Sequence, residues 1–422
     1  MFSNRNIFIA TVALLAGFMQ ILYPIPSPVP TNQVFMVLAA FLIIVLGQKG
    51  GMTFHYASVV FLLTIAISIM ANNIPYFFKP WSRYFQFVFL FIAASPMISG
   101  KMADRAKRNM TMGALWSCVF ITMLSFLGYF GGFGKYMSGF VQSYMGVTGH
   151  ANFLGMYAMV AMVWFAALFF RGTNMKEYAI IATAWVACLI TLLLSASRGA
   201  TAAGLLGSLI VIYMRLKESA TNMMTAVAVG IGLIIFASPY LATYMETMTQ
   251  KGIDADNMDS SVAATRGYIW ELRFMEHEKS PIVGIGSYSC DITLQWADTF
   301  YNADNGNIEL GSSYLGLLSQ QGYLGLVCFL ILALPIIWKT FKFANKQGTP
   351  YAQLMLGLLV AIACHMAFEG YLLTAGAVQS LIWWFVLGAA YQCDTVADYP
   401  VFWEKSDPIT PEQFVAWKEN HK

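Results

Sequence analysis

The chain has 422 residues, of which 58% are hydrophobic and only 11% are charged. Soluble domains carry roughly 25% charged residues, so this composition excludes a soluble multidomain enzyme, a disordered chain and a fibrous protein. The 24 basic and 21 acidic residues give a net charge of +3, too close to neutral to indicate a nucleic-acid partner. Because the apolar stretches recur from residue 7 to residue 392, the pattern predicts an all-α, polytopic membrane protein rather than a chain with one anchor.

The hydropathy pattern predicts about twelve transmembrane helices, each near the roughly 20 apolar residues that a span requires. They fall at residues 7–23, 29–47, 54–71, 84–99, 111–130, 151–170, 178–197, 200–216, 222–241, 313–338, 352–373 and 375–392. No Ala-x-Ala cleavage site follows the first stretch, so we interpret it as a retained helix. With both termini in the cytoplasm, most of the 24 basic residues fall in cytoplasmic segments, as the positive-inside rule requires.

This pattern divides the chain into four segments. Residues 1–241 hold the first nine spans, 242–312 form a long outer loop, 313–392 hold the last three spans, and 393–422 form a cytoplasmic tail. A loop of this length is uncommon unless it is functional or disordered. Its aromatic residues argue against disorder, so we expect it to fold around an amphipathic helix with further short helices. The six cysteines lie mostly in apolar runs and predict no disulfide framework.

Arg198 interrupts the segment LLLSASRGATAAGLL, where no other charge occurs between Glu177 and Arg215. A guanidinium group at a membrane boundary costs free energy unless it is solvated or paired, which makes it a candidate functional residue. Small residues on both sides would let a bulky partner approach it. The alternative is an arginine that extends to the lipid headgroups at a helix end.

The run VAATRGYIWELRFMEHEKSP in the long loop has helical periodicity. Arg266, Trp270, Arg273 and His277 are separated by four, three and four positions, so they share one face of the predicted helix. Two guanidinium groups on one face favour a diphosphate site, because the planar fork of arginine makes paired charge-assisted hydrogen bonds. The alternative is an amphipathic helix that rests on the membrane surface.

Two further groups of polar residues lie near predicted span ends. Glu309 is either a general base or a solvated loop residue, and Ser312 and Ser313 either border an acceptor or cap the span that follows. His365 and Glu369 are four residues apart in the predicted span 352–373, where they would form a proton relay or a structural pair. A relay would suit a secondary transporter or flippase, but the two halves of the chain show no repeat.

Motifs for metal and nucleotide chemistry are missing from the sequence. The Asp254-Ala-Asp256 segment stands apart from the other candidates, and there is no Gly-rich phosphate loop and no zinc spacing of His and Cys. We therefore expect no cofactor and no metal.

Several motifs together, in this order, resemble the O-antigen ligase and Wzy polymerase family. They are TGHANFLGMYA (148–158), SASRG (195–199), TRGYIW (265–270), P-x-x-G-I-G (281–286), SSYLGLLSQQGYLGL (312–326) and Glu369 with the Gly-rich segment 370–376. The resemblance implies an integral-membrane, metal-independent glycosyltransferase with a GT-C-related fold. It also implies an undecaprenyl-diphosphate donor at the periplasmic face of the bacterial inner membrane. By position, Arg198 and Arg266 would contact the donor diphosphate, and His150 and Asn152 would form the family's His-x-Asn segment.

The chain departs from the ligase pattern at Ser312-Ser313, where the ligases carry a His-Asn pair whose histidine is the proposed base. A serine does not take up a proton readily at neutral pH, so this departure favours a polymerase. The predicted reaction transfers a growing glycan from undecaprenyl diphosphate to a sugar hydroxyl of another lipid-linked repeat unit, of O-antigen or exopolysaccharide. The alternatives are a ligase that transfers glycan to lipid A-core in lipopolysaccharide synthesis, and a lipid-linked glycan flippase or secondary transporter.

The predicted catalytic residues are Arg198, Arg266 and Glu309. The predicted substrate-binding residues are Arg273, Trp270, His277, Ser312, Ser313, His150 and Asn152. The expected partners are the lipid-linked donor, the glycan acceptor, membrane lipid and a chain-length regulator.

Overall fold

The structure is a computed structural model that describes residues 31–72, 74, 79–136, 143–169, 175–217, 224, 262–294, 297, 301–302, 306–346 and 348–395. Its helices are α2 (Thr31–Lys49), α3 (Tyr56–Met70), α4 (Pro80–Ala94), α5 (Lys101–Gly131), α6 (Ala151–Phe169), α7 (Met175–Leu194), α8 (Arg198–Leu216), α10 (Val262–Lys279), α12 (Ser313–Lys346), α13 (Pro350–Met366) and α14 (Val378–Ala390). Short antiparallel pairs join β1 (Thr53–Phe54) to β2 (Ile98–Ser99), β3 (Lys135–Tyr136) to β4 (Tyr144–Gly146), and β5 (Tyr301–Asn302) to β6 (Asn307–Ile308).

The described part of the chain is mostly helical, as predicted, and 5 of its helices are long and apolar enough to cross a membrane: α5, α6, α7, α8 and α12. Helices α3, α13 and α14 are shorter and equally apolar. The chain is a multi-pass membrane protein. The predicted spans 7–23 and, apart from residue 224, 222–241 lie outside the described residues, as does the tail from residue 396, so the total of about twelve spans stays a prediction.

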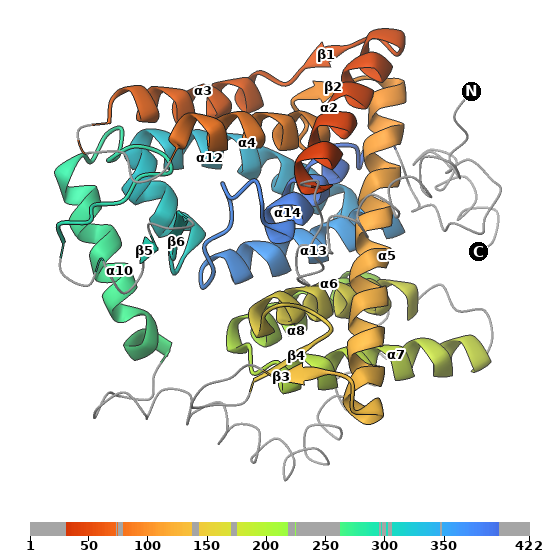
Figure 1. Ribbon diagram of the computed structural model, residues 1–422. Coiled ribbons are helices and arrows are strands. Elements are labelled where there is room, and N and C mark those ends of the chain that lie inside the picture. The colour runs from red at the N-terminus through yellow and green to blue at the C-terminus, as the bar shows by residue number, and fades with distance from the viewer. Residues whose placement is uncertain are drawn as a thin grey trace.

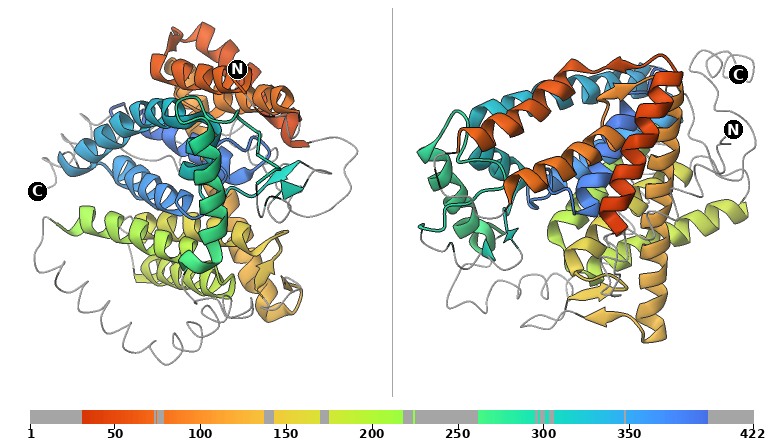
Figure 2. Two further views of the ribbon diagram at one scale, coloured as in Figure 1. Left: turned by 90° about the vertical axis from the view of Figure 1, so that its left-hand side faces the viewer. Right: turned by 45° about the horizontal axis from the view of Figure 1, so that its top comes forward.

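Two layers of helices pack against each other (Figure 1). Helices α6, α7 and α8 form one layer, and α8 packs on α13 of the other layer, which also holds α3, α4, α12 and α14. Close approach of α8 and α13 depends on glycine: a Cβ at Gly207 would lie 2.7 Å from the carbonyl oxygen of Gly357. Figure 2 shows α10 packed along the outer part of α12, beside the β5–β6 pair.

Helix α5 begins at Lys101, before the predicted span 111–130 begins, and contains that whole span. Lys107 is buried in this helix, and its ammonium group donates to the carbonyl oxygens of Ser95 and, at 2.6 Å, of Ile98. The last carbonyls of a helix lack partners within that helix, and Lys107 supplies a donor where α4 ends. Backbone carbonyl oxygens thus take the place of water around the Lys107 ammonium group, although its hydropathy predicts that this group is solvated.

Helix α13 ends at Met366, so the last part of the predicted span 352–373 is wrong. The chain leaves the helix and forms a loop from residue 367 to residue 377, which we call the 367–377 loop. Glu369 therefore does not share a helix face with His365. The imidazole Nδ1 of His365 instead lies 3.1 Å from the hydroxyl of Tyr371.

Helix α12 has 34 residues and a kink at Gly322, whose φ is 63°. The freed backbone N–H groups of Tyr323 and Leu324 donate to the carbonyl oxygens of Pro281 and Ile282, at 2.8 and 3.0 Å. A Cβ at Gly322 would lie 2.4 Å from the Ile282 oxygen, so only glycine fits. The kink thereby joins the P-x-x-G-I-G segment to α12.

Candidate functional site

The beginnings of α6 and α8 meet at the 367–377 loop. A Cβ at Gly155 in α6 would lie 2.7 Å from the Ser197 Cβ, directly before α8. A Cβ at Gly199 would lie 3.2 Å from the Cβ of Phe368, the residue before Glu369. Each helix beginning carries a partial positive charge, so this junction favours a negatively charged ligand.

Glu369 is the centre of the site. Its Oε1 accepts a hydrogen bond from Nη2 of Arg266 at 2.6 Å and another from Nδ2 of Asn152 at 3.0 Å. The Arg266–Glu369 ion pair is partly open to solvent, with side-chain exposures of 18% and 22%. These residues come from α10, the 367–377 loop and α6. We call Glu369, Arg266, Asn152 and Arg198 the Glu369 cluster.

Arg198 is the first residue of α8 and is half-buried. It lies close enough to Arg266 for the two positive charges to repel each other. In the part of the chain that the structure describes, its guanidinium group has no hydrogen-bond or ion-pair partner. Two guanidinium groups with one carboxylate leave excess positive charge, which suits a ligand with more than one negative charge.

Ser313 holds the backbone of the loop that carries Glu369. Its hydroxyl donates to the carbonyl oxygen of Glu369 at 2.7 Å and accepts the N–H groups of Tyr371 and Leu372 at 3.0 and 3.3 Å. Ser312 caps α12, because its Oγ accepts the N–H of Leu315 at 3.4 Å. The two serines thus act on the geometry of the site through its backbone.

The predicted helix in the long loop is α10, and the face predicted to carry the site packs against the rest of the protein. Nη1 of Arg266 and Nε1 of Trp270 both donate to the carbonyl oxygen of Gly311 at 3.4 Å. Arg273 and His277 lie further along the same face, and no described contact joins them to the Glu369 cluster. Arg266 and Trp270 therefore belong to the site, whereas Arg273 and His277 pack α10 against its neighbours.

Arg273 is fully buried and forms an ion pair with Glu276 at 2.9 Å. The Glu276 carboxylate also accepts the hydroxyls of Tyr301 and Ser319 and the N–H of Asp291. Burial raises the pKa of the Glu276 carboxyl, whereas the Arg273 charge and the hydrogen bonds from Ser319 and from the Asp291 backbone act against that increase. The pair fixes α10 to α12 and to the loops beside it.

The remaining predicted residues lie at the edges of the site. His150 precedes α6, and its Nδ1 lies 3.1 Å from the backbone N–H of Asn152. Because an N–H can only donate, Nδ1 accepts, and the proton of a neutral His150 ring is on Nε2. Nδ1 of His277 lies 3.3 Å from the Leu318 carbonyl oxygen. Glu309 is exposed before α12 and has no hydrogen bond or ion pair within the described ranges.

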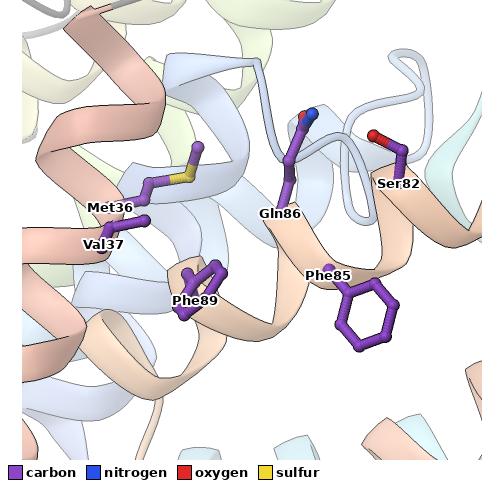
Figure 3. Close-up of a pocket in the computed structure, with 6 residues that line it drawn as sticks. All are labelled: Met36, Val37, Ser82, Phe85, Gln86 and Phe89. Atoms are coloured by element: carbon purple, nitrogen blue, oxygen red, sulfur yellow. The ribbon is translucent and has the colours of Figure 1, made fainter.

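Glu369 is the residue whose place in the site the sequence did not predict. Its sequence signals were an ionisable side chain in an apolar stretch and the glycines after it, but its partners come from segments more than 100 residues away. Among the residues that the structure describes, no group of three or more His, Cys, Asp and Glu side chains is placed to hold a metal ion. A separate groove between α2 and α4 contains none of the cluster (Figure 3), and Met36, Val37, Ser82, Phe85, Gln86 and Phe89 line it.

The fold and the site define a multi-pass helical membrane protein with a cationic cluster at converging helix ends. Residues 182–330 match the family model Wzy_C, O-antigen ligase, whose members are membrane glycosyltransferases. The match contains Arg198, α10 and the two serines, and it confirms the resemblance that the motifs indicated.

No curated protein matches the chain. One solved structure, titled "Structural coordination of polymerization and crosslinking by a peptidoglycan synthase complex", covers 92% of this chain and 96% of its own at 12% identity. Its TM-score of 0.35 is too low to support an argument about this protein.

Proposed function

We propose that the protein is a glycan polymerase of the membrane. It transfers a growing oligosaccharide from undecaprenyl diphosphate to a sugar hydroxyl of another lipid-linked repeat unit, at the periplasmic face of the inner membrane. The observation that carries the proposal is the pair Arg198 and Arg266. They are electrostatic neighbours at converging helix ends, within the segment that matches the O-antigen ligase family.

The chemistry of glycan transfer requires a place for a diphosphate leaving group. As the bond between sugar and phosphate breaks, negative charge develops on the phosphate oxygens, and fixed cations there lower the barrier. Arg198 and Arg266 supply such cations, and their planar forks can each bind two phosphate oxygens. The beginnings of α6 and α8 add partial positive charge from their backbone N–H groups.

The two serines favour a polymerase over a ligase. Ser312 caps α12 and Ser313 binds the backbone of the 367–377 loop, so both hydroxyls have structural partners where a ligase would carry its histidine. The ligase is kept as the second candidate because the matching family model is described as O-antigen ligase. Both candidates share the donor and the Glu369 cluster and differ in the acceptor.

The other predicted residues take supporting roles in this proposal. His150, Asn152 and Trp270 border the donor from α6 and α10. Arg273 and His277 act indirectly by holding α10 in place. A chain-length regulator is the further partner that a polymerase would require.

The decisive experiment uses purified full-length protein in lipid nanodiscs with a defined lipid-linked repeat unit. Polymer should form. Arg198→Ala and Arg266→Ala should each slow its formation about 100-fold or more, because each removes a hydrogen-bond donor that stabilises the negative charge of the transition state. The matched control is Arg105→Ala, which removes an exposed arginine from α5. Polymer formation at the wild-type rate in both variants would refute the proposal.

Two further assays separate the alternatives. Lipid A-core supplied as the acceptor detects a ligase, because glycan would then appear on that lipid. Labelled lipid-linked sugar in sealed vesicles detects a flippase, because the label would cross the bilayer without a change in glycan length.

A further inference from the structure

We propose that Glu369 is the base that takes the proton of the acceptor hydroxyl, and that the donor diphosphate activates it by displacing it from Arg266. This inference rests on the proposed glycan transfer and concerns the regulation of the same site. It assigns a role to a residue outside the matched segment 182–330.

The hydrogen bonds of Glu369 show why it needs activation. Its Oε1 accepts hydrogen bonds from both Arg266 and Asn152, and a carboxylate stabilised by such donors is a poor proton acceptor. Glu309 cannot be regulated in this way, because it is exposed and has no ion pair in the described part of the chain. Glu276 is held by Arg273 in the buried network behind α10.

The Arg266–Glu369 pair is suited to exchange. Both side chains are partly open to solvent, with exposures of 18% and 22%, so an incoming anion can reach the pair. A diphosphate carries more charge than one carboxylate and offers oxygens to both forks of the arginine pair. Arg198, which has no partner among the described residues, is available to bind the diphosphate first.

The carboxylate stays in place after the exchange. Ser313 binds the Glu369 backbone at 2.7 Å, and the Asn152 amide still donates to the side chain. Loss of the Arg266 contact therefore removes a positive charge from beside Glu369 but leaves the Glu369 side chain where it was. The released carboxylate faces the same cluster that holds the diphosphate.

The acceptor oxygen attacks the anomeric carbon of the donor sugar and forms the new C–O bond, while its proton passes to the Glu369 carboxylate. The bond between the anomeric carbon and the phosphate oxygen breaks, and its electron pair leaves with undecaprenyl diphosphate. Glu369 returns its proton to solvent and pairs again with Arg266 when the lipid departs.

The test measures donor binding and transfer separately, with Glu369→Gln, which keeps the side-chain shape and a hydrogen-bond acceptor. The binding probe is undecaprenyl diphosphate without sugar, added to protein in nanodiscs. Glu369→Gln should bind it about fivefold more tightly, because Arg266 no longer has a competing anion, while transfer falls at least 100-fold. The control Glu271→Gln removes an exposed carboxylate from α10 and should leave both values unchanged.

Weaker or unchanged binding by folded Glu369→Gln would overturn the inference, and so would transfer at the normal rate. If Glu369→Gln does not fold, Glu369→Asp replaces it, and the inference then requires transfer that stays measurable and falls at acid pH. The two proposals fail differently. Wild-type protein that makes no glycan product refutes the function, whereas polymerising protein without the gain in binding refutes only the exchange.

Discussion

Ser313 shows how one hydroxyl positions a functional residue. It makes three hydrogen bonds to the backbone of residues 369, 371 and 372, two of them to N–H groups that have no helix to satisfy them. Ser313→Ala leaves these buried groups unpaired, at a cost of about 1–3 kcal/mol for each. We expect a lower melting temperature in detergent and slower glycan transfer, measured on the same preparation.

Ser312→Ala is the matched comparison, since it removes a neighbouring hydroxyl. Its Oγ caps α12 and donates a long hydrogen bond, at 3.5 Å, to the carbonyl oxygen of Met366, but it makes no described hydrogen bond to the 367–377 loop. The expected loss is therefore about 1 kcal/mol, with transfer near normal. A larger loss of transfer in Ser312→Ala than in Ser313→Ala would show that the cap, and not the loop contact, positions the site.

The buried pair of Arg273 and Glu276 gives a second prediction for single residues. Arg273→Met leaves an unpaired buried carboxylate and should lower the free energy of unfolding by about 3–5 kcal/mol. Adding Glu276→Gln should recover much of this loss, because the neutral amide needs no counter-ion and still accepts the Tyr301 hydroxyl. A double-mutant cycle of unfolding in detergent measures the coupling, and simple additivity of the two single changes would contradict it.

The sequence predicted the residues of α10 better than those of the 367–377 loop. Helical spacing correctly placed Arg266 and Arg273 on one face, but it did not show that Glu276 would neutralise one of them. The same rule paired His365 with Glu369, although the helix ends between them. That end depends on Ser313, which binds the loop from 58 residues away. Local spacing carries no information about such a distant partner.

Among the elements, the kink of α12 connects the outer loop to a span. Gly322→Ala places a methyl group 2.4 Å from the Ile282 oxygen, at a φ of 63°. We expect a fall in melting temperature that corresponds to several kcal/mol, from steric overlap together with backbone strain of about 1–3 kcal/mol. The change should also reduce transfer, because the loop segment 281–286 helps to position α10.

Gly267→Ala in α10 is the control for this prediction. A Cβ at Gly267 would meet no atom within 4 Å, and its backbone is helical. Alanine there should raise helix stability by about 0.5–1 kcal/mol. Equal melting temperatures for the two alanine variants would show that the kink does not require glycine.

The residues at which helices begin and end were the hardest feature to predict from hydropathy. Hydropathy placed α6 and α8 correctly, because their apolar runs end where the helices end. It missed the first turns of α5, where Lys107 is satisfied by carbonyls of residues 95 and 98 rather than by water. A hydropathy scale treats every lysine as solvated, so it cannot detect a charge with buried partners.

Across the whole molecule, the site joins four separate segments. Asn152, Arg198, Arg266 and Glu369 belong to α6, α8, α10 and the 367–377 loop, and only their order as motifs was visible in the sequence. The contact of α6 with Ser197 and α8, and that of α8 with the 367–377 loop, depend on glycines at positions 155 and 199 that admit close approach. The sequence predicted Asn152, Arg198 and Arg266 as site residues but not Glu369, and the assembly of all four is a property of helix packing.

The orientation of the whole bundle is the last prediction. The positive-inside rule places Lys101 and Lys346 in the cytoplasm, and the alternation of spans then places Glu309 and Glu271 in the periplasm. All four side chains are exposed, so each position suits a single introduced cysteine. Of the six native cysteines, only Cys364 is partly exposed, and alanine at all six gives the background.

In intact cells, a maleimide that cannot cross the inner membrane should label cysteines at 309 and 271 but not those at 101 and 346. Labelling at the latter two should appear after the inner membrane is permeabilised. Because Arg266 contacts Gly311, two residues after Glu309, the same result places the Glu369 cluster on the periplasmic side. The reverse pattern would put the arginines in the cytoplasm, where a donor already moved to the periplasmic face could not reach them, and the proposed polymerase would then be untenable.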